Sequence, residues 1–233
     1  MGICCMPLSS AEREAFRQLA ADLPGVDLPI YEQFAKDPLD PIIGLGDPEA
    51  PLGFFGRDPG REEVKYGEPF IGSGGQIARK VLYKHLYGHP PADFEASRSL
   101  SQQFFWANTV PYKPLGNKAW SERVKKTFHP LMRRLLVEHW HGTQLITFGR
   151  EAFLWFGIGQ SKEERARLEA FWKSEDRFES SIEVTLETEE GTCKTLTLYP
   201  LPHPSPLNQT WYTRFPGLLE VRVKKLILTK GVI

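Results

Sequence analysis

Short apolar runs bounded by glycine, proline or asparagine recur along this chain, separated by longer segments with helical periodicity. Residues 53–56, 103–109 and 144–149 have the length and composition of buried strands. Residues 179–202 alternate apolar and polar positions on both sides of residues 190–191, which predicts a β-hairpin whose second arm enters the sheet. The pattern therefore predicts four strands that can share one sheet.

The segments between these strands have helical patterns. Residues 76–87 and 121–140 repeat apolar positions at helical spacing, residues 161–172 are charged and helical, and a final helix begins near residue 217. On the helix over residues 121–140 we expect cationic side chains on a solvated face or against phosphates, namely Arg123, Lys125, Lys126, Arg133 and Arg134. The alternation of strands and helices favours one domain built on a parallel sheet.

The first quarter of the chain has a different pattern. Ser9 and Glu12 have the spacing of a capping box at the start of an amphipathic helix that Pro24 ends. Residues 24–51 hold six prolines with several glycines and aspartates, which predicts an extended surface connection.

Composition narrows the class of protein. Apolar residues make up 41% and charged residues 25%, as in an ordinary globular domain. Lys and Arg together number 29, as do Asp and Glu, so any binding of a polyanion must come from a local patch. No apolar run has the length of a membrane span, and the three cysteines form neither a CxxC pair nor a disulfide framework. We expect an intracellular, cytoplasmic monomer without a metal or a membrane anchor.

Three of the four predicted strands end in a polar residue with a possible chemical role. These residues are Asp58, Asn108 and His203. The carboxyl ends of parallel strands share one edge of a sheet, where ligands bind, so the three side chains are expected to converge. Each also has a simpler explanation: Asp58 as part of a turn, Asn108 as a cap and His203 as a buried, hydrogen-bonded histidine.

A carboxylate, an amide and an imidazole around an aromatic crevice suit cleavage of an N-glycosidic bond. The carboxylate can stabilise an oxocarbenium-like sugar and orient water, while the imidazole donates to the departing base. The amide presents a donor and an acceptor together, as the edge of uracil requires, and the rings can hold a base taken out of its stack.

Four motifs in one order make this sequence resemble the uracil-DNA glycosylase superfamily. Residues 56–59 (GRDP) resemble its water-activating motif, and residues 67–76 resemble the segment that places a stacking Phe in the thermophile-type iron–sulfur branch. Residues 106–110 (WANTV) are similar to the strand with the base-reading Asn, and residues 203–207 (HPSPL) match the His-Pro-Ser leucine loop. The resemblance covers residues 52–228.

The resemblance implies a fold and a set of roles. The fold is a three-layer α/β/α class with a central, mainly parallel four-stranded sheet, in a single domain over residues 1–233 whose core is 52–228. Asp58 and His203 would be catalytic, and the implied partner is DNA with uracil or another deaminated base, without a cofactor. Asn108, Phe70 and Gly60 would bind the base, and the DNA contacts would be Gly72, Ser73, Gly75, Ser205 and, as the wedge, Leu207.

The sequence also departs from the family patterns. Gly60 stands where the most uracil-restricted branch has a bulky Tyr, and Arg57 stands where the thermophile-type branch has an acidic residue. Three cysteines cannot build the four-cysteine cluster of that branch. The expected activity is thus a monofunctional glycosylase that acts at the nucleoid on uracil, hypoxanthine or xanthine, or on single strands only. The alternatives are an inactive nucleic-acid-binding protein and a small-molecule nucleoside hydrolase.

Overall fold

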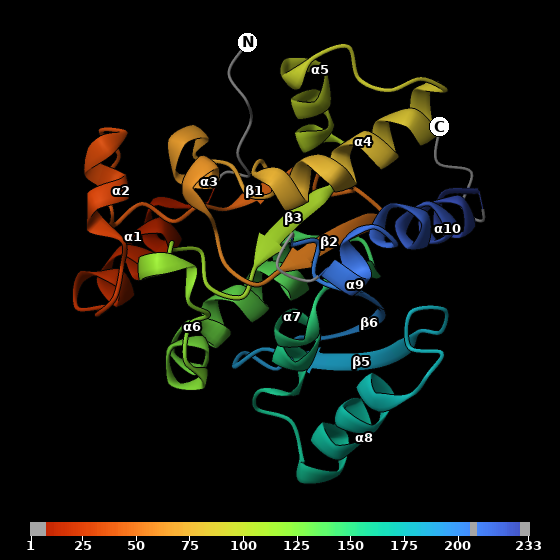
Figure 1. Ribbon diagram of the computed structural model, residues 1–233. Coiled ribbons are helices and arrows are strands. Elements are labelled where there is room, and N and C mark those ends of the chain that lie inside the picture. The colour runs from red at the N-terminus through yellow and green to blue at the C-terminus, as the bar shows by residue number, and fades with distance from the viewer. Residues whose placement is uncertain (1–7, 206–208, 229–233) are drawn as a thin grey trace.

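A six-stranded sheet forms the middle of the molecule in this computed structural model, which describes residues 8–205 and 209–228 (Figure 1). The order across the sheet is β1-β3-β2-β4-β6-β5. The strands are β1 (Gly44–Leu45), β2 (Leu52–Gly56), β3 (Phe105–Asn108), β4 (Gln144–Phe148), β5 (Ile182–Glu187) and β6 (Cys193–Leu201). The four central strands run parallel, and β1 and β5 pair antiparallel at the edges.

The central strands are buried on both faces, as expected of a parallel sheet with helices on each side. Every residue of β2 and β3 is buried. Successive side chains of a strand point to opposite faces, so Phe54 and Phe55 enter two different hydrophobic clusters. Phe54 pairs in register with Trp106 on β3, and the two rings stack with centroids 4.4 Å apart.

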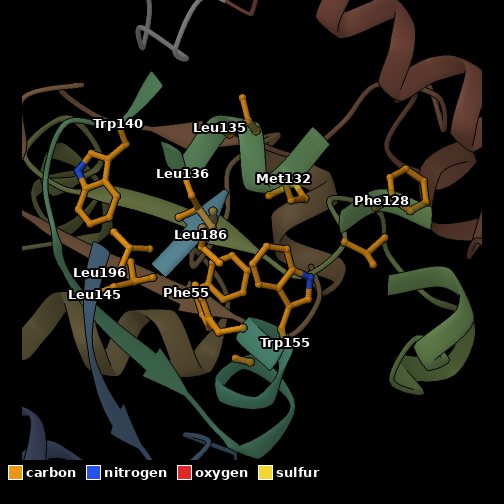
Figure 2. Close-up of a cluster of buried hydrophobic side chains, with 14 of the residues drawn as sticks. Phe55, Phe128, Met132, Leu135, Leu136, Trp140, Leu145, Trp155, Leu186 and Leu196 are labelled. Carbon is orange, nitrogen blue, oxygen red and sulfur yellow. The ribbon is translucent and has the colours of Figure 1, made fainter. Parts of the chain in front are cut away.

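The cluster around Phe55 is covered by helices from both halves of the chain. The helices that cover it are α1 (Ser10–Ala21), α6 (Glu122–Arg134) with the π-helical turn Leu135–His139, α7 (Arg150–Leu154) and α8 (Lys162–Lys173). Figure 2 shows Phe55 beside Trp155, with ring centroids 5.0 Å apart. The ring of Phe16 stacks on Phe128, so the N-terminal helix packs into the same layer as α6.

The opposite face of the sheet packs against α4 (Ser73–Tyr87) and α10 (Phe215–Leu228). In Figure 1, α4 lies above β3 and α10 lies to the right of β2. The remaining helices are short and lie in connections: α2 (Leu28–Gln33), α3 (Arg61–Tyr66), α5 (Phe94–Arg98), α9 (Gln209–Tyr212) and the 3₁₀ turns Ser99–Gln102, Leu115–Asn117 and Trp155–Gly157. Within residues 8–205 and 209–228, no helix is long and apolar enough to cross a bilayer.

The structure confirms the α/β class and the mainly parallel sheet but corrects two expectations. The sheet has six strands rather than four, because both arms of the hairpin join it and β1 adds a further edge strand. Residues 24–51 are not a wholly extended connection, since they contain α2 and β1. Two residues of strand are too few to show a period in the sequence, and the register of β1 is set by its pairing with β3.

Candidate active site

A cleft of about 710 Å³ opens at the carboxyl ends of β2, β3 and β6 and is closed on one side by the start of α4. The four residues with predicted chemical or stacking roles, Asp58, Phe70, Asn108 and His203, all line it. The other predicted residues that line it are Gly60, Gly72, Ser73, Gly75 and Ser205. Leu207 lies outside the described residues. Parallel strand ends thus bring together residues that are up to 145 positions apart, from Asp58 to His203.

Asp58 follows β2 directly, and its side chain is only 1% exposed. Its Oδ1 accepts a hydrogen bond from the Thr109 hydroxyl at 3.2 Å, and its Oδ2 lies 3.0 Å from Arg57 Nε without the geometry of a hydrogen bond. Burial raises the pKa of Asp58 from 3.8 to about 6, while the charges of Arg57 and Lys125 act in the opposite direction. Asp58 is therefore ionised at neutral pH, and its Oδ2 is ion-paired with Arg57.

His203 follows β6 and lies next to the turn after β4. The backbone of Gly149 has φ +87°, and a Cβ at Gly149 would come within 2.9 Å of the His203 Cβ, so a glycine allows both the turn and the close approach. Burial, helped by the charge of Arg57, lowers the pKa of His203 from 6.5 to about 4. The imidazole is consequently neutral at physiological pH, with one ring nitrogen protonated.

Phe70 and Asn108 converge above Gly56, the last residue of β2. A Cβ at Gly56 would lie 2.6 Å from Phe70 Cζ and 3.3 Å from Asn108 Nδ2. The Phe70 ring is also fixed by Trp106 and Phe148, at centroid distances of 5.4 and 5.5 Å. Asn108 is buried, and its Oδ1 accepts no hydrogen bond from any residue that the structure describes. A buried amide oxygen without a protein donor is a site for a ligand donor.

The backbone of Phe70 is held in an unusual conformation by buried groups beneath it. Its φ is +58°, a left-handed value that is rare for an aromatic residue. Its carbonyl oxygen accepts a 2.8 Å hydrogen bond from Nε of the buried Arg79, and Gly75 packs directly against the same peptide. Arg79 also lies over the Trp106 ring at 4.6 Å. The backbone of Phe70 is thus held by α4, which carries both Gly75 and Arg79.

Glu63 is a site residue that the sequence analysis did not assign. It is buried on α3, and its two oxygens accept hydrogen bonds from the N–H of Gly60 at 2.9 Å and from the N–H of Gly72 at 2.7 Å. The carboxylate therefore joins the loop after Asp58 to the glycine-rich loop before α4. The spacing of Gly60 and Glu63 is that of an N-cap and its third helical residue, a signal that was present in the sequence.

This bond bears on the roles expected of two glycines. The N–H of Gly72 donates to Glu63, and the expected role of Gly72 as a phosphate contact stays a prediction. A Cβ at Gly60 would lie 2.7 Å from Glu63 Oε2, so a bulky residue there would push against the carboxylate. Ser73 is exposed at the first turn of α4, where backbone dipoles favour anions, and its expected role as a phosphate contact stays a prediction.

The cleft lies at the carboxyl edge of the sheet and holds a carboxylate, an amide, an imidazole and an aromatic wall. This is the usual arrangement of the active site in layered α/β enzymes. A comparison with protein families identifies the family to which this α/β protein belongs. The model of the uracil DNA glycosylase superfamily matches residues 43–227, and this chain belongs to that superfamily. The expected family is thus confirmed, and membership supports a glycosylase-type activity on DNA.

Proposed function

We propose that this protein is a monofunctional DNA glycosylase that hydrolyses the N-glycosidic bond of uracil, or of another deaminated base, and leaves an abasic site. The observation that carries the proposal is the convergence of the buried Asp58 carboxylate and the buried Asn108 amide in the cleft that Phe70 and His203 also line. Asn108 Oδ1 accepts no hydrogen bond from any described residue, and a buried acceptor of this kind is costly unless a ligand satisfies it.

The geometry supports a separate role for each of the four side chains in the cleft. A base turned out of the duplex would stack on Phe70 and present its edge to Asn108, whose amide both donates and accepts. The Asp58 carboxylate would orient the attacking water and stabilise the positive charge that develops on the sugar as the glycosidic bond breaks. The neutral His203 would donate a hydrogen bond to the base as it leaves as an anion.

A single assay tests the proposal against its alternatives. A uracil-containing oligonucleotide is incubated with the protein and then treated with alkali, which breaks the strand at abasic sites. Strand breakage at the uracil is the expected result. A mobility shift without breakage would instead support a nucleic-acid-binding protein, and base release from free nucleosides alone would support a small-molecule hydrolase. Oligonucleotides with hypoxanthine, xanthine or mismatched thymine define the range of bases, which the small residue Gly60 leaves open.

The pH dependence of the reaction should follow the ionisation of Asp58. Because burial raises the pKa of this carboxyl to about 6, it is protonated and inactive below that pH, and kcat/KM should fall as pH drops through about 6. His203, with a pKa of about 4, remains neutral over the same range and adds no second loss there. The measurement is a pH–rate profile with DNA binding followed in parallel. A rate that stays level well below pH 6 would contradict this assignment.

Asn108→Asp should shift base selectivity from uracil towards cytosine. The variant has only acceptors when ionised, and it prefers the donor edge of cytosine to the mixed edge of uracil. We expect release of uracil to fall by about 10²-fold or more, since a site that loses a specific polar match rejects its ligand strongly. Competing oligonucleotides with uracil or cytosine measure the change. The control is Asn108→Ala, which should lose uracil release without any gain for cytosine, and unchanged selectivity in both variants would make Asn108 structural.

A further inference from the structure

Arg57 is a charged residue of the cleft to which the proposed mechanism gives no part. Its Nε lies 3.0 Å from Asp58 Oδ2, and its Nη2 donates a 3.0 Å hydrogen bond to the carbonyl oxygen of Asn117. Asn117 lies in the connection between β3 and α6, where its backbone has φ +57°. The guanidinium therefore has two partners, the Asp58 carboxylate at Nε and the peptide oxygen of Asn117 at Nη2.

A second arginine that lines the same cleft, Arg61, is more exposed and less closely paired than Arg57. The side chain of Arg61 is 52% exposed and comes no nearer than 3.8 Å to its carboxylate partner, Glu62. The Arg57 side chain is 29% exposed and is bound to a carboxylate that is itself 1% exposed. Ion pairs at exposed sites contribute little, whereas a charge next to a buried carboxylate acts through a medium of low polarity. The charge of Arg57 can therefore act strongly on the buried Asp58 carboxylate, whereas the charge of Arg61 cannot.

We propose that Arg57 is a positioning residue for base release: it holds the Asp58 carboxylate in its orientation and supplies the fixed positive charge beside it. This inference rests on the proposed function. It assigns a role to the arginine that replaces the acidic residue of the thermophile-type branch at this position. Arg57 acts here through its neighbours and needs no contact with the base.

The electrostatic argument follows from where the charges lie. Among the charged groups, Arg57 and Lys125 of α6 lower the pKa of Asp58, with Arg57 the larger of the two, and Arg57 lowers that of His203. The other charged residues that line the cleft are Arg61, Glu62 and Glu63. One fixed cation favours the anionic carboxylate, which water activation needs, and adds to the effect of burial in disfavouring the imidazolium.

The test compares Arg57→Gln with two matched variants. Arg57→Gln removes the charge, so the pH at which kcat/KM falls on the acid side of the profile (the acid limb) should rise by about one unit or more. A shift of this size is expected when a carboxylate loses an adjacent arginine. Arg57→Lys keeps the charge and should leave the limb within a few tenths of a unit of wild type. Arg61→Gln removes a charge from the same cleft away from Asp58 and should leave the limb in place. Thermal melting confirms that each variant is folded.

A second readout separates this inference from the proposed function. The imidazole shifts of His203 in NMR, assigned with His203→Gln, report its pKa without any turnover. Arg57→Gln should raise that pKa and Arg57→Lys should not. If the wild-type protein released no base, the proposed function would fail while the titration still tested the electrostatic role of Arg57. An acid limb and a His203 titration that both coincide with wild type in Arg57→Gln would overturn the inference.

Discussion

Asp58→Asn is expected to lower the turnover of a uracil-containing oligonucleotide by about 10²–10⁴-fold, the range attributed to a positioned general base. The substitution keeps the shape of the side chain, and the Thr109 hydroxyl can still donate to the remaining oxygen. The variant loses the negative charge that would stabilise the oxocarbenium-like sugar and the oxygen that would orient water. Affinity for the oligonucleotide should change little, because a buried carboxylate makes no favourable contact with phosphates.

The measurement is single-turnover base release, with binding followed by fluorescence anisotropy. Glu62→Gln is the matched control, since Glu62 is another carboxylate that lines the cleft but is 40% exposed and lies away from Asp58. Its rate should stay close to that of the wild type. Equal rates for Asp58→Asn and the wild type would remove Asp58 from the mechanism, and equal losses in both variants would point to the overall charge of the cleft instead.

Gly75→Ala is expected to destabilise the protein by about 1–3 kcal/mol, the usual range for forcing atoms into a filled space. An added Cβ would lie 2.0 Å from the carbonyl oxygen of Phe70 and 2.2 Å from its carbonyl carbon, and a peptide cannot move aside as a flexible side chain can. The clash exceeds the gain of about 1 kcal/mol that alanine brings to a helix. It also displaces the peptide of Phe70 that Arg79 binds.

The control for this substitution is Gly217→Ala. Both glycines are the third residue of a helix, α4 or α10, but a Cβ at Gly217 would meet no atom within 4 Å. Urea unfolding should therefore show a small gain in stability for Gly217→Ala and a loss for Gly75→Ala. Base release should fall in Gly75→Ala even under conditions where the variant is fully folded, because the stacking ring is displaced. A folded Gly75→Ala protein with wild-type activity would show that the position of Phe70 is unimportant.

Local patterns in the sequence were enough to predict most of the elements that carry the site. The buried runs before Asp58 and Asn108 became β2 and β3, and the capping box of Ser9 and Glu12 begins α1 as expected. The motifs also identified Asp58, Asn108, Phe70 and His203 as residues of one cleft. These predictions succeeded because strand length, helical period and motif order are properties of short segments.

Other features depend on neighbours that are distant in the sequence. Lys125 was placed with the cationic residues of a solvated face, yet its side chain is 6% exposed, is paired with Glu151 and acts on Asp58. Helical spacing could not show this, since the partner of Lys125, Glu151, is on a separate helix, α7. The count of strands also required the structure, because β1 is defined only by its hydrogen bonds to β3.

The sequence by itself determined the alternation of strands and helices, the polar residues at the strand ends and the superfamily that these residues indicate. Only the tertiary structure decided how those residues act on one another: the contact of Arg57 with Asp58, the bridge from Glu63 to Gly60 and Gly72, and the left-handed backbone of Phe70. The physical reason is that burial and the distance between charges set pKa values and hydrogen-bond partners, and both arise only when separate segments pack together.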